Sequence, residues 1–169
     1  MRSDYVDPEI MGHIMAALTP ANAAAIEVAM HTGLRIGDVL AMRTAKLGPR
    51  MWVHEAKTGK TRRIYLPGPL LSRLRALAGP VWVFPGRLDP SKHRTRQAVY
   101  KDIRRAADAF RVRAHVSPHS ARKVYAVEQL RKTGDLRKVQ RLLQHEDSAV
   151  TAIYAMADVL TQRKLSRRR

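Results

Sequence analysis

The stretch MWVHEAKTGKTRRIYLP, residues 51–67, is where the periodicity of the chain changes from helical to extended. The runs MWVHEA and TRRIYLP contain the β-branched and aromatic residues that favour strands. The KTGK segment between them places Gly59 where a tight hairpin turn needs a left-handed backbone. We therefore expect an antiparallel hairpin here, within a chain whose other segments have helical patterns.

Helix start and stop signals precede this hairpin. The segment 7–19 opens with Asp-Pro-Glu and the segment 19–33 with Thr-Pro, and in both an N-cap residue is followed by proline in the first turn. Gly33 suits the left-handed residue that ends the second of these helices. A short helix, RIGDVLAMR, is expected to begin at Arg35.

Further helices are expected after the hairpin. The VWVF run at 81–84 either adds a strand or fills the core, and Ser148 is a good N-cap for AVTAIYAM. The expected fold is mixed α/β and mainly helical, with a small antiparallel β-sheet, and 169 residues are enough for about one domain. The other expected helices lie at 69–78, 95–110, 117–134 and 135–144.

The charge distribution indicates a polyanionic partner. The formal net charge is +18. Residues 1–34 carry one basic and four acidic side chains, whereas residues 35–169 carry 31 basic and ten acidic ones, a net charge of +21. A folded domain this basic usually binds nucleic acid. The chain lacks an apolar run long enough to span a membrane and a signal-peptide pattern at its start, so we expect a cytoplasmic protein with no membrane partner.

Two common kinds of phosphate chemistry are disfavoured. The GKT triplet at 59–61 lacks the preceding glycine of a nucleotide-binding P-loop, because His54 occupies that position. With no cysteine, a zinc site would need histidines, and the pair His115 and His119 has Pro118 between its members and no obvious third ligand. We therefore expect neither a metal nor another cofactor.

The spacing of His145 and Tyr154 is informative. Nine residues at 100° each would place the two side chains on opposite faces of one continuous helix. The polar segment HEDS, residues 145–148, interrupts the apolar pattern between them. A helix break there would let the two side chains converge.

Five segments in this order resemble the catalytic domain of tyrosine recombinases, the phage integrase family. They are HTGLRIGDVL (31–40), the hairpin lysine, PHSAR (118–122), QHEDS (144–148) and AIY (152–154). The resemblance covers residues 32–154 and is specific because the order and the spacing from His145 to Tyr154 both match. The catalytic residues that it implies are Arg35, Lys57, His119, Arg122, His145 and Tyr154, with Asp38 in a supporting role that orients Arg35.

The resemblance implies metal-free and ATP-free cleavage of DNA, with Tyr154 attacking the phosphorus to form a 3′-phosphotyrosyl link. Apart from the resemblance, arginine is well suited to bind a scissile phosphate, because its planar guanidinium can bind two oxygens at once and stays charged. Arg35 and Arg122 are the expected clamp. Lys57 is the implied general acid, with Lys60 as the alternative. Taken singly, each of these residues could instead belong to a surface ion pair, a helix end or the core.

Several further basic residues are expected on a solvated or phosphate-contacting face, with double-stranded DNA as the partner. They are Arg62, Arg63, Arg94, Arg96, Lys101, Arg104 and Arg105. Lys123 and Gln144 depart from the family pattern, in which His and Gly are frequent at these positions.

The resemblance also implies an N-terminal core-binding domain, whereas here Met1 leads directly into the catalytic domain, so we assign residues 1–169 to that domain alone. Self-assembly on paired DNA sites, as a tetramer when full length, is implied too. The C-terminal helix after Asp158 is expected to dock on a neighbouring subunit or on its own domain, and the remaining alternative is a frayed basic tail that contacts phosphates. A type IB topoisomerase-like enzyme and a non-catalytic DNA-binding relative remain alternatives.

Overall fold

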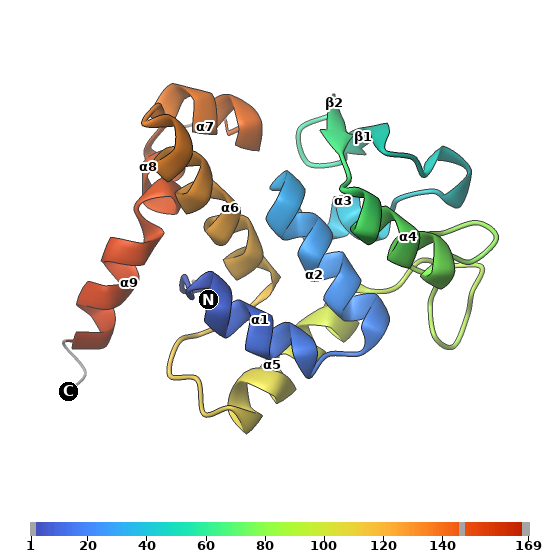
Figure 1. Ribbon diagram of the computed structural model, residues 1–169, viewed down its shortest axis with the longest axis horizontal. Helices are drawn as coiled ribbons and strands as arrows, with labels where there is room; N and C mark the ends of the chain where they lie inside the picture. Colours follow the sequence, from blue (N-terminus) through green and yellow to red (C-terminus); the bar gives the residue numbers. More distant parts are fainter. Residues whose placement is uncertain (1–2, 146–147, 167–169) are drawn as a thin grey trace.

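The computed structural model describes residues 3–145 and 148–166. Figure 1 shows a hairpin and α4 on one side of the central helix α2, and the helices α6 to α9 on the other side. The elements in chain order are α1 (Pro8–Ala16), α2 (Pro20–Thr32), α3 (Ile36–Leu40), the 3-10 turn η1 (Thr44–Lys46), β1 (Arg50–Glu55), β2 (Lys60–Tyr65), α4 (Gly68–Leu77), α5 (Arg96–Ala109), α6 (Pro118–Thr133), α7 (Leu136–Leu143), α8 (Ser148–Ala155) and α9 (Ala157–Ser166). The expected mainly helical fold with a small antiparallel sheet is confirmed.

The hairpin forms where the periodicity changes. β1 pairs with β2 in an antiparallel register that sets Val53 opposite Arg62. The turn contains Gly59 with a φ of 66°, as its left-handed position requires. Met51, Val53 and Glu55 point inward, so one face of β1 buries a carboxylate beside two apolar side chains. Lys57 lies in the turn between the strands.

The helix ends follow the sequence signals closely. α2 begins at Pro20 and ends before Gly33, which has a φ of 67°. α6 has a capping box in which the Ser117 side chain accepts from a backbone N–H and the Ser120 hydroxyl accepts from the N–H of Ser117. Asp135 caps α7 through the N–H of Lys138. These ends are predictable because capping depends on neighbouring residues alone.

Two helix boundaries are less regular than the sequence predicted, and one open question is resolved. α1 ends at Ala16, three residues before Thr19. Of the two roles expected for the VWVF run, the structure has the second: Val83 and Phe84 fill the core, and Trp82 makes an isolated bridge with Arg43. α8 includes Ser148 as its first residue instead of following it, and the residues just before it lie outside those described.

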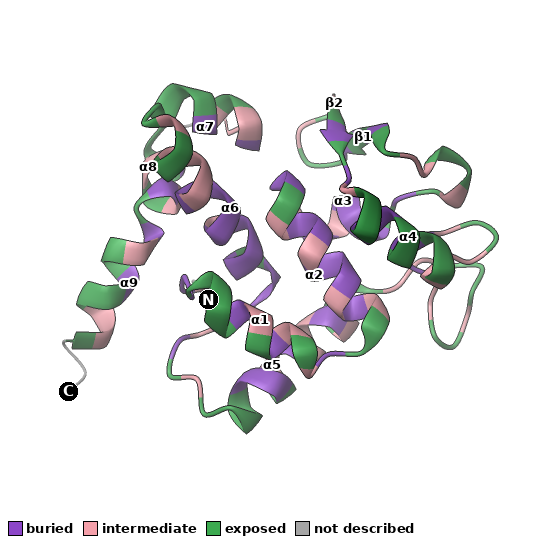
Figure 2. Ribbon diagram, in the orientation of Figure 1, coloured by how far each residue is buried: buried purple, intermediate pink, exposed green. Residues whose placement is uncertain are grey.

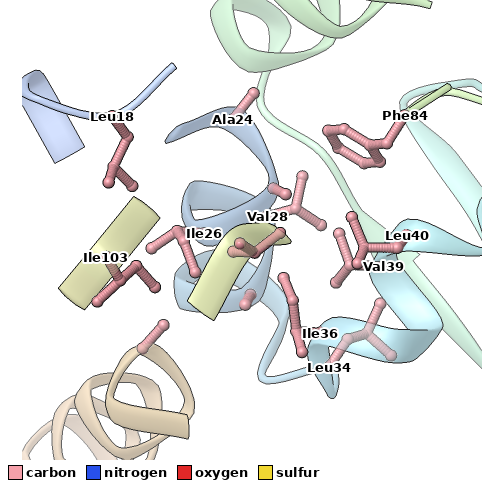
Figure 3. Close-up of a cluster of buried hydrophobic side chains, with 14 of the residues drawn as sticks. Leu18, Ala24, Ile26, Val28, Leu34, Ile36, Val39, Leu40, Phe84 and Ile103 are labelled. Atoms are coloured by element: carbon pink, nitrogen blue, oxygen red, sulfur yellow. The ribbon is translucent and has the colours of Figure 1, made fainter. Parts of the chain in front are cut away.

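The largest apolar core surrounds α2. Figure 3 shows Ile26 and Val28 of α2 packed among Leu40 of α3, Ile103 of α5 and the buried Phe84. α6 covers this core with Ala121, and half of its residues are buried (Figure 2).

Two smaller clusters lie against the other faces of α6. Tyr125 and Ala126 of α6 pack with Val139 and Leu143 of α7 and with Ala155 of α8. Val124 and Val127 of α6 pack with Tyr5 and with Ala157 of α9 in the second cluster. α6 therefore joins the large core to the helices that follow it.

The C-terminal helix α9 packs on its own chain. The Tyr5 N–H donates to Thr161 Oγ1 at 3.0 Å, and Lys164 Nζ lies 2.6 Å from Asp4 Oδ1. Arg131 of α6 pairs with Asp158 at 2.7 Å. Of the two docking modes expected from the sequence, this structure has the one within the domain. No helix in the described part of the chain is both long and apolar enough to cross a bilayer.

Candidate active site

Arg35 is held at the junction of α2 and α3. It follows the left-handed Gly33 by two residues and is the N-cap residue of α3, so the local backbone fixes where its side chain starts. Its Nη1 donates to Glu55 Oε2 at 2.6 Å, and the Glu55 side chain has no exposed surface. A charge-assisted bond this short orients the guanidinium. Arg35 still lines the groove described below.

The carboxylate that holds Arg35 is therefore that of Glu55, not that of Asp38 as the sequence predicted. Asp38 is buried, and its Oδ1 accepts the N–H of Ala56 at 3.0 Å. This bond ties α3 to the start of the hairpin turn. Asp38 thus holds the backbone of the residue before Lys57 and does not orient the Arg35 guanidinium.

Arg122 of α6 is the largest fully enclosed polar side chain near Arg35, with an exposed fraction of 2%. Its Nη1 donates to the carbonyl of Gly33 and its Nη2 to the carbonyl of Leu143, both at 2.5 Å. Burial lowers the pKa of Arg122 to about 10, and the charge of Arg35 acts in the same direction. The guanidinium is therefore still charged at neutral pH, and it links the ends of α2 and α7.

Tyr154, His119 and His145 converge as the proposed helix break would allow. The Tyr154 hydroxyl lies 3.5 Å from His119 Nδ1, across the interface of α8 with the start of α6. The ring of His145 meets that of Tyr154 edge-on, with centroids 5.1 Å apart. The prediction that His145 and Tyr154 approach one another is confirmed.

Both histidines are uncharged at neutral pH in this setting. Burial lowers the pKa of His145 to about 4, and the charges of Arg122 and Arg35 add to the effect. Burial and the same two arginines lower the pKa of His119. A neutral imidazole can accept a proton. Burial raises the pKa of the Tyr154 hydroxyl, so it holds its proton until a group removes it.

A groove of about 1030 Å³ runs from Arg35 and His119 along the hairpin. Lys57, the expected general acid, lines it together with Arg35 and His119. Lys60, the alternative acid, is the exposed first residue of β2. Further along the groove, Arg43 lies 3.7 Å from the centre of the Trp82 ring.

The seven basic residues expected on a DNA-contacting face separate into groups. Arg96 lines the groove, and Arg63 and Lys101 are exposed. Arg104 pairs with Asp108 at 2.9 Å, Arg105 pairs with Asp102 at 2.7 Å, and Arg94 is partly buried.

Arg62 does not lie on that face, and its assignment to it is wrong. Its side chain is only 11% exposed and lies 3.1 Å from the buried Glu55 carboxylate. The sequence could have indicated Glu55, because it shares the inward face of β1 with Met51 and Val53. The inward orientation of Arg62 has no such signal, since its strand neighbours are polar.

No three His, Asp or Glu side chains come close enough to hold a metal ion within residues 3–145 and 148–166. The arrangement that the structure does provide is a tyrosine hydroxyl beside two neutral imidazoles, with two guanidinium groups next to them. Such a site can bind a phosphodiester and supply a nucleophile to it.

Solved structures of recombinases share this fold. The crystal structure of XerA recombinase superposes with a TM-score of 0.77 at 20% identity, covering 97% of this chain and 62% of that one. A lambda integrase dimer bound to a COC′ core site superposes with a TM-score of 0.75 at 19% identity, covering 92% and 60%. The fold is therefore that of tyrosine recombinase catalytic domains.

Sequence comparison gives the family. The phage integrase family pattern matches residues 5–160. The tyrosine recombinase XerD of Bradyrhizobium diazoefficiens is 35% identical over 147 residues, covering 76% of this chain and 46% of the relative. XerD of Rhizobium meliloti is 31% identical over 142 residues, covering 78% and 45%. The chain belongs to the phage integrase family and spans about half the length of these curated relatives.

Proposed function

We propose that this chain is the catalytic domain of a site-specific recombinase that breaks and rejoins double-stranded DNA through Tyr154. The observation that carries the proposal is the position of the Tyr154 hydroxyl, 3.5 Å from His119 and beside His145 and the arginine pair. The net positive charge beyond residue 34 supports a DNA substrate, as do the relatives named above. We further propose that the protein acts on DNA in the cytoplasm.

In the proposed cleavage step, the Tyr154 oxygen attacks the scissile phosphorus and its proton passes to a neutral histidine, for which His119 is the nearest candidate. Arg35 and Arg122 stabilise the charge on the nonbridging oxygens. Lys57 gives a proton to the departing 5′ oxygen. One P–O bond forms and another breaks, leaving a 3′-phosphotyrosyl link and a free 5′-hydroxyl.

The reverse step with another strand's 5′-hydroxyl rejoins the DNA. Because the link conserves the energy of the phosphodiester, no ATP is needed. The proposal needs no metal ion because the two arginines supply the positive charge at the nonbridging oxygens. Exchange between two duplexes requires several active sites in one assembly. We extend the proposal to a tetramer on paired DNA sites when the protein is full length. The dimer of lambda integrase on its core site supports the self-assembly part of this proposal.

The test uses nicked DNA sites selected from a random library, which trap the covalent intermediate once the short strand diffuses away. The chain should form a denaturation-resistant DNA adduct in EDTA, and Tyr154→Phe should bind the same site without forming it. Tyr65→Phe is the matched control, because Tyr65 is an exposed tyrosine on β2. An adduct with Tyr154→Phe, or a strict need for a divalent ion, would sink the proposal.

Two other outcomes would redirect it. Relaxation of one supercoiled duplex without exchange between two would indicate a topoisomerase. Tight binding to the selected site with no adduct from the unaltered chain would indicate a DNA-binding relative without catalysis.

A further inference from the structure

Arg62 is a largely buried cation that the proposed cleavage step does not use. It lies on β2 between Thr61 and Arg63, both of which are exposed, while its own side chain turns inward. Burial lowers its pKa, and the nearby Glu55 opposes this effect. A charge is expensive to bury unless it is paired and hydrogen-bonded. The hydrogen-bond and ion-pair partners of Arg62 therefore indicate which parts of the structure it stabilises.

Those partners come from three different segments. Arg62 Nη2 donates to the carbonyl of Thr32 at 2.9 Å, and its Nη1 donates to the carbonyl of Leu142. Its Nε lies 3.1 Å from Glu55 Oε1. The two carbonyls belong to the last turns of α2 and α7, where helix carbonyls carry partial negative charge.

Each of these segments leads within three residues to a group of the proposed site. Thr32 precedes Arg35, and Leu142 precedes His145. Glu55 precedes Lys57 by two residues and also binds Arg35 through its other oxygen. The Arg62 guanidinium thus contacts the segments that lead to Arg35, to His145 and to Lys57.

A second contact joins the hairpin turn to the end of α7. The Thr58 hydroxyl lies 3.3 Å from Gln144 Oε1. Gln144 has a φ of 50°, a left-handed conformation that side chains other than glycine rarely adopt. The unusual backbone brings its amide to the residue next to Lys57. The Thr58–Gln144 contact and the Arg62–Leu142 contact therefore both connect the hairpin to the end of α7.

We propose that Arg62 is a positioning residue: it fixes the hairpin turn, and with it Lys57, against the helix end that leads to His145. The proposal rests on the proposed function for its catalytic consequence and on the contacts alone for its structural one. Arg62 touches neither the substrate nor the reacting atoms. Arg62 affects the reaction by setting the position of Lys57, which in the proposed function protonates the 5′ oxygen.

The kinetic test compares two substrates at saturating DNA. Replacing the 5′-bridging oxygen of the scissile phosphate by sulfur gives a leaving group that needs no proton. Arg62→Met should slow adduct formation on the ordinary site by about 10- to 100-fold, the usual effect of displacing a reacting group. On the sulfur-containing site it should recover most of that loss. Arg62→Lys keeps the charge without the fork and should show a similar, smaller defect.

Arg63→Met is the matched control, since Arg63 is the exposed neighbour on the same strand. It should change the rates on both substrates by one common factor. Equal loss for Arg62→Met on both substrates would overturn the proposal, as would weakened DNA binding with full cleavage at saturation.

A structural readout covers variants that react poorly for other reasons. The amides of Thr58 and Gly59 donate to the carbonyl of Glu55 at 3.2 Å and 2.9 Å, so their hydrogen exchange reports on the turn. In folded Arg62→Lys, and to a lesser extent in Thr58→Val, exchange across this turn should rise at least about 10-fold relative to the amides of α4. Unchanged exchange would overturn the proposal even if the unaltered chain formed no adduct, whereas a missing adduct alone would count against the proposed function.

Discussion

Replacing Gly33 by alanine should destabilise the fold far more than the same change at Gly134. Both glycines end a helix in the left-handed conformation, with φ angles of 67° and 65°. A residue with a Cβ costs about 1–2 kcal/mol in this conformation. The backbone penalty is therefore common to Gly33→Ala and Gly134→Ala.

The surroundings of the two positions differ. A methyl group on Gly33 would lie 2.4 Å and 2.5 Å from two ring carbons of Tyr125, and on Gly134 it would meet nothing within 4 Å. Tyr125 is buried among the small core of α7 and α8, so its ring has little room to move. Overpacking of this kind adds about 1–3 kcal/mol. We expect Gly33→Ala to lose about 2–5 kcal/mol and Gly134→Ala about 1–2 kcal/mol.

Urea unfolding followed by circular dichroism measures both free energies of unfolding, and equal slopes would show that the unfolded states are comparable. Gly33→Ala should also impair cleavage, because the Gly33 carbonyl accepts from Arg122. Equal losses of stability in the two variants would refute the reasoning, since they would show that the Tyr125 ring yields without cost.

Three further predictions concern pH, salt and the C-terminal helix. Because burial in the folded protein lowers the pKa of His145 to about 4 from its ordinary value of 6.5, stability should fall as pH drops through this window, by about 1–2 kcal/mol at pH 5. Urea unfolding of His145→Gln should show a shallower pH dependence. Log affinity for duplex DNA should fall with log salt by about 0.9 per phosphate contacted, and a flat titration would place the basic surface in solvent. Thr161→Val removes the acceptor of the buried Tyr5 amide and should lower the free energy of unfolding by about 1–3 kcal/mol. The control is Thr61→Val at an exposed position, which should leave the free energy of unfolding unchanged.

Much of this fold follows from local signals in the sequence. The starts of α1, α2, α6 and α7, the left-handed glycines and the hairpin were all predictable, because caps and turns depend on a few adjacent residues. The run at 81–84 was ambiguous for a physical reason: short apolar segments fit a strand or a core equally well, and only the packing of Phe84 decides.

The supporting contacts of the site were less predictable. Asp38 was expected to hold Arg35 because the two residues are close in sequence, yet Glu55 does so from another element. Arg62 was expected on a solvated or phosphate-contacting face because charged residues are usually exposed. Its inward position depends on carbonyls brought together by tertiary structure. Local sequence patterns identify the candidate catalytic residues, but not the residues from other elements that position them.

The two bonds that Arg122 makes to the carbonyls of Gly33 and Leu143 have an entropic consequence. A free arginine side chain loses up to about 2 kcal/mol of rotamer entropy when it is immobilised. Here that loss occurs when the protein folds, before any DNA is present. In the proposed reaction, a phosphate bound by Arg122 would meet a side chain that has no rotamer freedom left to lose, so ordering the arginine would not weaken the contact.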